Sequence, residues 1–485
     1  MILGNCIPIP FGKRSDAYQW DIINNFIADV IADGGTFEDA ACMYQEIQHL
    51  LGQAYGGSNA YDEATLVLTA NAWNTSIMYA VKRGVGLSDF PFARALAAYR
   101  VDSSGNLELM GNDVPRLTYD TSYNGCPAWL FEPARTNLIL QSDTMSASPW
   151  ALGSGGTGVN PVLLSSTELD PFGDNLACKY TFNAGAGLTS ADRSFLVQTV
   201  TVLNATTYNS GFWARGENGG EQLVFRHVGA SAYLLCNLTT EWQRFDVAEL
   251  STGTAVSYLI EIRQGTTNGT INASATVYLS GAHVEQGVKA TSNIDTLGAT
   301  VLRPADVSTR TDLQTGGYLG TESGSFYIDY ENTSQSAASA SKEIEVSGGA
   351  AVDAIQLQAS TLSGSVYPLS FRKVVASVAT VLFTPSYSPA NIRALFVYDA
   401  TTLSIYMNGV KVVDSTSFTR ANNALDTFDI LGGGLYRKAI RVVDFSDATP
   451  TDAQAEGATG FSSLDDYLLF IGYSSDDPSL YASYL

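Results

Sequence analysis

Histidine is the side chain best suited to acid–base work and metal binding near neutral pH, and this chain of 485 residues contains only three. His49, His227 and His283 are far apart, and none lies in an H-E-x-x-H motif or beside a second histidine. The chain also lacks a G-x-S-x-G nucleophile motif and a Walker-type phosphate loop. We therefore expect no catalytic residue, no metal ligand and no cofactor, and we expect that the chain is not an enzyme.

Carboxylates leave one alternative open. A glycosidase needs two carboxylates held together in a cleft, and the chain has 48 Asp and Glu residues, whose spacing singles out no pair. Residues 102–105 begin like a calcium-binding loop but lack the later bidentate glutamate, which predicts an ordinary turn. A polysaccharide depolymerase thus remains an alternative without assigned residues.

Aromatic residues are the candidates for sugar binding, which uses an exposed ring beside amide and carboxylate hydrogen-bonding groups. The candidate carbohydrate-binding residues are Trp150, Trp213, Tyr233 and Trp242. Each lies within or beside a run of alternating apolar and polar residues, where a core position is the more common role. Both roles stay open for each residue.

Composition and charge define the general class of the protein. Hydrophobic content is 45% and charged content only 15%, with 44 Gly and 25 Tyr, which favours β-sandwiches over helical structure. The net charge of −22 repels phosphate backbones and anionic lipids. No apolar run of about 18 residues exists. We expect neither a nucleic-acid partner nor membrane insertion.

The cysteines are odd in number and far apart. They are Cys6, Cys42, Cys126, Cys178 and Cys236. Because no C-x-x-C pair occurs, the sequence suggests neither a disulfide framework nor a zinc site. We expect buried free thiols.

The first 60 residues should contain a helical hairpin. Apolar residues recur at helical spacing from Ser15 to Leu51, Gly34 and Gly35 end the first helix, and Thr36 with Asp39 forms the expected N-terminal cap of the second, whose apolar positions include Phe37. So short a pair buries little surface alone. We expect it to pack against copies of itself or against another protein, and an ordinary core within its own chain is the alternative.

The remaining chain reads as β structure in three parts. A connector with β-hairpins is expected over 61–136, a jelly roll over 137–296 and a second sandwich over 297–485. In the last part, Asn408-Gly409 predicts a two-residue type I′ turn between alternating strands. The expected fold class is mainly β, with a short N-terminal α-helical region followed by two β-sandwich (jelly-roll) domains.

A series of residues between Arg94 and Ser142 carries a resemblance to a known protein family. They are Arg94-Ala95, Tyr99, Val101-Asp102, Gly105, Asn112, Pro115-Arg116, Tyr119-Asp120, Cys126, Leu130, Glu132-Pro133, Arg135-Thr136-Asn137-Leu138 and Ser142. In this order they resemble a segment of tailed-bacteriophage virion proteins of the fibre and head-spike type. The chain departs from that pattern at Leu96 to Ala98, where the family usually has a Ser/Thr-rich stretch.

Two further resemblances concern the β parts. Residues 137–142, 210–215 and 277–287 resemble a carbohydrate-binding-module-like jelly roll, which Arg303-Pro304-Ala305-Asp306 and its surroundings close. Residues 393–412, 428–432 and 439–455 resemble a concanavalin/laminin-G-like sandwich.

These resemblances imply a bacteriophage virion structural protein, a fibre or spike subunit on head or tail, which aids adhesion to host-surface polysaccharide. They imply synthesis in the host bacterial cytoplasm, location in the virion, attachment to other virion proteins through the N-terminal region, and a homo-oligomer, with a trimer favoured. The depolymerase and a purely structural decoration protein are the alternatives. A secreted lectin-like protein would need an export signal, which the sequence does not suggest.

Overall fold

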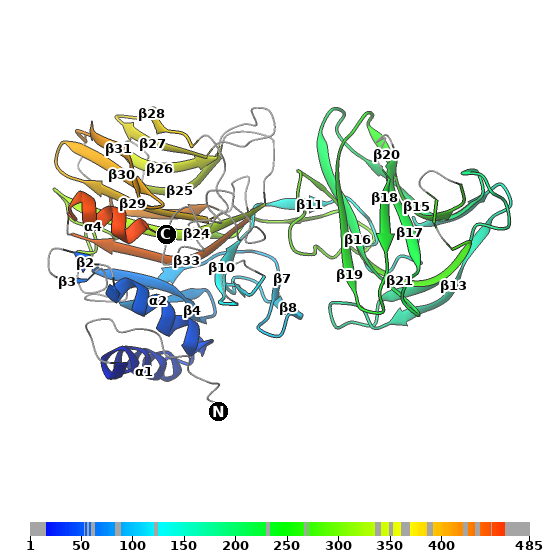
Figure 1. Ribbon diagram of the computed structural model, residues 1–485, viewed down its shortest axis with the longest axis horizontal. Helices are drawn as coiled ribbons and strands as arrows, with labels where there is room; N and C mark the ends of the chain where they lie inside the picture. Colours follow the sequence, from blue (N-terminus) through cyan, green and yellow to red (C-terminus); the bar gives the residue numbers. More distant parts are fainter. Residues whose placement is uncertain are drawn as a thin grey trace, which may run out of the picture.

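The structure is a computed structural model that describes residues 16–52, 54–55, 58–59, 64–82, 89–120, 125–228, 233–265, 269–270, 272–334, 341–348, 353–359, 369–385, 391–420, 425–431, 437–447 and 449–460. The expected fold class is confirmed: the chain is mainly β, with a short helical region near its N-terminal end. Figure 1 shows two bodies, which we call the base and the jelly roll. The base contains the earliest and the latest elements of the described chain, and the jelly roll lies between them in sequence.

The base is built around two antiparallel sheets. Sheet I has eleven strands within the described residues, with the main order β31-β30-β29-β24-β33-β4-β5-β6; β1 pairs with β4, and β10 pairs with β33 and β9. Its strands are β1 (Thr36–Phe37), β4 (Leu66–Asn74), β5 (Ile77–Lys82), β6 (Phe90–Pro91), β9 (Leu117–Thr118), β10 (Ala128–Phe131), β24 (Gly324–Ser334), β29 (Asn391–Tyr398), β30 (Thr402–Met407), β31 (Val410–Ser417) and β33 (Arg437–Ser446). Sheet II follows the order β23 (Val307–Arg310), β32 (Thr427–Leu431), β25 (Ser341–Ser347), β26 (Ala354–Ala359), β27 (Leu369–Val375) and β28 (Val378–Phe383).

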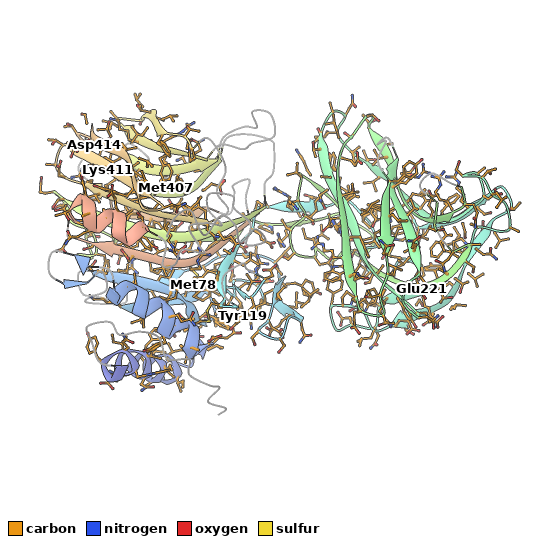
Figure 2. All side chains as sticks on the ribbon, viewed as in Figure 1. Met78, Tyr119, Glu221, Met407, Lys411 and Asp414 are labelled. Carbon is orange, nitrogen blue, oxygen red and sulfur yellow. A yellow bond between two sulfur atoms is a disulfide. The ribbon has the colours of Figure 1, made fainter. Side chains whose placement is uncertain are left out.

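Aromatic residues fill the space between sheets I and II. Phe326 and Phe396 stack at 4.3 Å between ring centroids, and Phe371 of sheet II lies 5.7 Å from Phe396. Met78 and Met407, from widely separated strands of sheet I, belong to the same buried cluster; Figure 2 labels both within the base. Alternate side chains of each sheet therefore point toward the other sheet, and together they form one large hydrophobic core between sheets I and II.

Strands from the two ends of the chain share sheet I. Leu66 to Thr69 of β4 lie opposite Phe445 to Val442 of β33. Strands from the range 61–136 and from the range 297–485 are therefore neighbours in one sheet, and the jelly roll is inserted between them in sequence.

The N-terminal helices cover the outer face of sheet I. Helices α1 (Asp16–Ala32) and α2 (Ala40–Gly52) bury Ile23, Val30 and Met43 in one cluster with Ala72 and Tyr79 of β4 and β5. Helix α4 (Asp452–Thr459) covers another part of the same face. Of the three predicted arrangements, the structure thus shows packing of the hairpin against its own chain.

The N-cap of α2 and a disulfide fix that hairpin. Asp39 Oδ1 accepts a hydrogen bond of 3.0 Å from the Cys42 amide and caps α2. The prediction was wrong for Thr36 and Phe37, which form the short strand β1 before the helix. Cys42 is bonded to Cys126 across 84 residues of sequence. The prediction of five free thiols was therefore wrong for this pair, because folding brings α2 beside the segment before β10, a proximity that sequence spacing does not reveal. Cys178 and Cys236 are free and buried, and Cys6 lies outside the described residues.

The predicted turns in the base are present. The hairpin β7 (Ala98–Val101) and β8 (Leu107–Met110) turns over Asp102, whose Oδ1 accepts from the amides of Ser104 and Asn106. Asn408 and Gly409 both have positive φ, 49° and 85°, and connect β30 to β31 as a two-residue turn. A further small hairpin joins β2 (Ala54–Tyr55) and β3 (Ser58–Asn59).

The jelly roll is a sandwich of two five-stranded antiparallel sheets. Sheet III has the order β12 (Ala151–Gly155), β15 (Arg193–Thr201), β20 (Ala255–Arg263), β17 (Gln222–Val228) and β18 (Leu234–Asn237). Sheet IV has the order β13 (Val159–Glu168), β14 (Ala177–Asn183), β21 (Ser274–Gln286), β16 (Thr207–Gly216) and β19 (Gln243–Leu250). Their inner faces share one buried apolar cluster, which includes Phe212, Phe225 and Tyr258.

Two short strands join the jelly roll to the base. They are β11 (Arg135–Asn137) and β22 (Val301–Arg303), which pair with each other as the chain enters and leaves the jelly roll. Asn137 is fully buried and donates to the carbonyls of Ala282 and Ile294, while its Oδ1 accepts from the amides of Ile139 and Val284. The Asn137 side chain thus connects β11, by which the chain enters the jelly roll, to β21 and to Ile294, which precede the point where the chain leaves it.

A buried ion-pair network lies directly beneath this connection. Arg116 pairs with Glu132 at 2.9 Å and also with Asp306, Arg303 pairs with Glu132 at 3.0 Å, and Arg94 pairs with Asp306 at 3.3 Å. Every side chain in the network is no more than 1% exposed. We call these five residues the junction network. The scattered polar residues of the predicted signature therefore meet at one point, where the two bodies join.

Candidate functional site

The four aromatic residues predicted to bind carbohydrate do not form one site. Trp150 is 9% exposed and belongs to the jelly-roll core, where its indole Nε1 donates to the Gln141 carbonyl at 2.8 Å. Its role is structural, because its ring packs 5.5 Å from Tyr258 and offers no free face. The other three candidates are partly exposed and lie in three different places.

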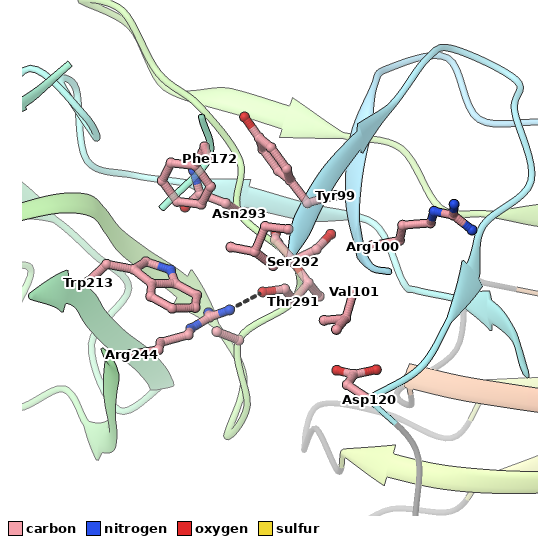
Figure 3. Close-up of a pocket in the computed structure, with 12 residues that line it drawn as sticks. Tyr99, Arg100, Val101, Asp120, Phe172, Trp213, Arg244, Thr291, Ser292 and Asn293 are labelled. Atoms are coloured by element: carbon pink, nitrogen blue, oxygen red, sulfur yellow. Dashed lines mark hydrogen bonds between the residues drawn. The ribbon is translucent and has the colours of Figure 1, made fainter. Parts of the chain in front are cut away.

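Trp213 lines a pocket between the jelly roll and the base (Figure 3). The pocket has a volume of about 190 Å³. Phe172 and Trp213 come from the jelly roll, and Tyr99 and Val101 come from the β7–β8 hairpin of the base. Pockets between two bodies are common ligand sites, so this is the candidate functional site, and we call it the junction pocket.

Three aromatic rings form a series along the junction pocket. Tyr99 and Phe172 have centroids 4.9 Å apart, and Phe172 meets Trp213 edge to face at 6.1 Å. Gly281 makes this approach possible: its φ is +60°, and an added Cβ would lie 2.7 Å from Trp213 and 2.8 Å from Phe172. This glycine occupies an irregular position of β21, where the pairing register with β16 shifts.

Polar groups line the rest of the pocket, and Arg244 lies beside Trp213, because the two residues are opposite each other in the pairing of β16 with β19. Arg244 Nη1 donates to the Thr291 carbonyl at 3.1 Å, as drawn in Figure 3, and its Nε pairs with Asp246 at 3.2 Å. Asn293 and Asp120 also line the pocket. Aromatic surface in one pocket with a fixed guanidinium, an amide and a carboxylate is a lining that can bind sugar hydroxyls beside a ring face.

His283 supports this arrangement from beneath. It is 1% exposed and lies 2.9 Å from Asp246 and 3.0 Å from Asn209 Oδ1. Burial would raise the pKa of Asp246, but Arg244 and His283 together hold it below its usual range. His283 therefore positions Asp246, and Asp246 in turn positions Arg244. The side chains of His49 and His227 lie outside the described residues.

A group of carboxylates, of which Asp143 and Asp170 are buried, lies behind the aromatic series. Tyr99 donates its hydroxyl to Asp295 at 3.1 Å, across the boundary between base and jelly roll. Burial first, and then the charge of Asp295, raise the pKa of Asp143 to about 7. Burial also raises the pKa values of Asp170 and Asp295. Within the described part of the chain, no group of three or more His, Cys, Asp or Glu side chains could hold a metal ion.

Trp242 lies on the outer face of sheet IV. The guanidinium of Arg215 lies 5.5 Å from its ring and 3.7 Å from the ring of Tyr278, and the Lys179 amine follows at 5.0 Å from Tyr278. This alternation of rings and cations occupies both faces of Tyr278 with the protein's own side chains. The ladder stabilises the surface of sheet IV, and Trp242 at its end is half-buried.

Tyr233 lies on the outer face of the other sheet, sheet III. Arg226 and Arg263 lie 5.2 Å and 4.9 Å from its ring. Its partners were not expected from the sequence, because arginines 37 residues apart come together only through the pairing of β17 with β20. The sequence-based search named Tyr99, Phe172 and Arg244 in no binding role either. Their common signal, an aromatic or basic residue next to a turn or strand end, is too frequent to single them out.

Comparisons with known proteins identify no family for this chain. No family model matches it, and no curated protein matches it. Among solved structures, TmCBM61 in complex with β-1,4-galactotriose matches at 16% identity and a TM-score of 0.22, covering 31% of this chain and 98% of that one. The CBM2 module of the evolved Dit of Lactobacillus casei BL23 phage J-1 matches at 13% identity and a TM-score of 0.22, covering 29% and 69%.

A match of another class is the Trypanosoma rangeli sialidase in complex with the inhibitor DANA. It shares 8% identity at a TM-score of 0.23 and covers 77% of this chain and 78% of its own. This finding contradicts the expectation that the chain is not an enzyme, which was wrong as a conclusion. Scattered histidines and missing nucleophile motifs exclude little, because glycosidases work with carboxylates. Scores this low assign neither a family nor an activity.

Proposed function

We propose that the chain is a structural protein of a tailed-bacteriophage virion, a fibre or spike subunit whose jelly roll binds host-surface glycans in the junction pocket. The observation that carries the binding role is the aromatic series of Tyr99, Phe172 and Trp213, with the fixed guanidinium of Arg244 beside Trp213. Phe172 and Trp213 are partly exposed and offer apolar surface for a sugar ring, while Tyr99, which is 3% exposed, supports Phe172 from behind. The polar groups of the pocket offer donors and acceptors for the sugar hydroxyls.

The size of the pocket defines what it can hold. The pocket volume of about 190 Å³ is below the range of about 300–1,000 Å³ that is typical of sites for drug-sized ligands. That space suits one sugar ring at the end or side of a polysaccharide rather than a long buried segment. Binding at one such site is weak, and several copies on one particle would raise avidity by about 10² to 10⁴.

The virion role is supported by what the signature residues do. Arg94, Arg116 and Glu132, which carry the resemblance to phage fibre and spike proteins, form the junction network with Arg303 and Asp306. The network holds a jelly roll outward from a base, an arrangement suited to display. The base would attach to other virion proteins through its N-terminal region, and copies would assemble as a homo-oligomer, with a trimer favoured.

The test is glycan binding by the full-length protein, using an array of host capsule and lipopolysaccharide fragments. Trp213→Ala should weaken binding about 30-fold, the loss typical of a buried aromatic anchor of about 2 kcal/mol. Trp242→Ala, a matched change at the end of the sheet IV ladder, should leave binding unchanged. Equal binding by wild type and Trp213→Ala would refute the junction pocket as the site. A reducing-end assay on the same mixtures measures cleavage directly.

A further inference from the structure

Three arginines converge on one face of the jelly roll, away from the junction pocket. Arg193 of β15, Arg226 of β17 and Arg263 of β20 all surround Glu261, with nitrogen–oxygen distances of 3.6, 3.2 and 3.2 Å. Glu261 is fully buried, and the three arginines are its charge partners. Three positive charges therefore face a single carboxylate on sheet III, in a chain whose net charge is −22.

Two aromatic rings complete this cluster. Tyr233 lies beside Arg226 and Arg263, and its hydroxyl accepts from Arg226 Nη1 at 3.3 Å. Arg193 lies 4.8 Å from the ring centroid of Phe195. A hydrogen bond from Arg263, and the charge of Arg226, lower the pKa of Tyr233. The Tyr233 hydroxyl thus lies in a positive electrostatic environment, because Glu261 alone does not neutralise the charges of the surrounding arginines.

The cluster has donors to offer. The side chains of Arg193 and Arg226 are 32% and 19% exposed, so solvent reaches both guanidinium groups. Arg263 Nε is buried and has no hydrogen-bond acceptor among the described residues. A guanidinium has five N–H donors in a planar fork that matches a carboxylate or sulfate. Rings beside such forks also provide the apolar face that a sugar needs.

We propose that the outer face of sheet III, at Arg193, Arg226, Arg263 and Tyr233, binds the acidic group of an anionic glycan, such as the carboxylate of a uronic acid. This inference rests on the proposed glycan-binding function and names the ligand class for a second face of the same jelly roll. The two exposed guanidinium groups hold the acidic group, while Tyr233 and Phe195 contact the sugar ring. The net charge of −22 disfavours acidic ligands in general, and the three arginines oppose this effect locally.

The experiment uses the full-length protein with two matched probes, an oligogalacturonate and its methyl ester, measured by calorimetry. The acid should bind and the ester should bind at least about tenfold more weakly. Affinity for the acid should fall when NaCl rises from about 0.05 to about 0.5 M, because the ions screen the exposed arginines. Equal binding of acid and ester would overturn the proposal.

The variants Arg193→Gln and Arg226→Gln should each weaken binding of the acid about tenfold. Either change leaves Glu261 with two arginine partners, so the fold should persist, which thermal unfolding checks. Tyr233→Phe keeps the ring and serves as a second, milder variant. The control Arg215→Gln makes the same charge change on sheet IV and should have no effect.

Two outcomes separate this site from the junction pocket. Loss of acid binding in Arg226→Gln with retention in Trp213→Ala supports the anionic site, whatever the pocket does. Unchanged binding in Arg226→Gln, or an equal loss in Arg215→Gln, would show that the acid is held by general charge and would overturn the assignment.

Discussion

Arg116 and Glu132 form an ion pair of 2.9 Å in which both side chains are completely buried. They are 16 residues apart in sequence and lie where the chain leaves the base for the jelly roll. Glu132 also accepts from the Ser292 amide at 2.8 Å and pairs with Arg303, both on the returning segment. One carboxylate therefore ties together the outgoing and the returning chain.

Glu132→Ala should destabilise the junction by about 3–5 kcal/mol, because it leaves Arg116 and Arg303 buried with fewer counter-charges. Urea unfolding followed by tryptophan fluorescence measures the loss. The control is Glu217→Gln, which removes a partly exposed pair with Lys179 and should cost at most about 1 kcal/mol. A loss of similar size in both variants would show that the junction network contributes no more than a surface ion pair.

The disulfide Cys42–Cys126 should stabilise the packing of α2 on the base. It closes a loop across 84 residues, for which chain entropy predicts an upper contribution of about 4.6 kcal/mol. Cys42→Ser should lower the free energy of unfolding by about 2–4 kcal/mol under oxidising conditions and make no difference in excess reductant. Thiol titration of the denatured chain before and after reduction should show two additional thiols. An unchanged thiol count would mean that the two sulfurs do not bond.

Asp143 should make stability depend on pH in the neutral range. Its pKa is raised from 3.8 to about 7, so between these values the folded chain holds a proton that the unfolded chain has lost. The resulting stabilisation is complete below about pH 4 and disappears as pH rises through 7. Asp143→Asn removes this dependence, and the stability of wild type relative to this variant should fall by about 1–3 kcal/mol from pH 5 to 8.

Chemical denaturation at several pH values gives the measurement for Asp143. Asp170 and Asp295, whose pKa values burial also raises, act on the same group and stay in place in the variant. Asp414→Asn, on the exposed surface of the base (Figure 2), makes the same charge change and should leave the slope unaltered. Parallel curves for wild type and Asp143→Asn would contradict the prediction.

Local features of this fold were predictable because they depend on neighbouring residues. Asn408-Gly409 forms the expected turn, since an isolated pair of residues determines a type I′ hairpin. The Asp39 cap and the two helices were predictable for the same reason. The pairing of β4 with β33 was not predictable. The two strands are separated by more than 360 residues, and any other strand edge with a similar pattern of apolar and polar residues could have paired with β4 instead.

The candidate site was predictable only in part. Trp213 was named from the sequence and does line the junction pocket, but Trp150, named on the same evidence, is a core residue. The alternation of apolar and polar residues indicates on which side of a strand a side chain lies. It does not indicate whether that side is packed in the core or borders a pocket. The arginines around Glu261 come from three strands, so their convergence depends on register rather than on spacing.

Attachment through the N-terminal region can be tested at an exposed apolar residue of α1. Ile31 is 64% exposed, although α1 otherwise buries its apolar side against α2 and sheet I. Ile31→Asp should leave the unfolding free energy within about 0.5 kcal/mol of wild type, as for most surface substitutions, and should reduce incorporation into particles. Asn25→Asp, also exposed on α1, is the charge-matched control. Normal incorporation of Ile31→Asp would place the attachment surface elsewhere.

Gly281 determines whether the junction pocket keeps its shape. Its φ of +60° disfavours any other residue, and a Cβ would meet Trp213 at 2.7 Å and Phe172 at 2.8 Å. Gly281→Ala should therefore displace both rings, weaken glycan binding at the pocket by at least about tenfold, and cost about 1–3 kcal/mol of stability. Gly317→Ala in the base is the matched control: its φ is +74°, but nothing lies within 4 Å of an added Cβ, so it should show a similar backbone strain without loss of binding. Equal glycan binding by Gly281→Ala and wild type would show that the packing of Trp213 against Phe172 plays no part in recognition.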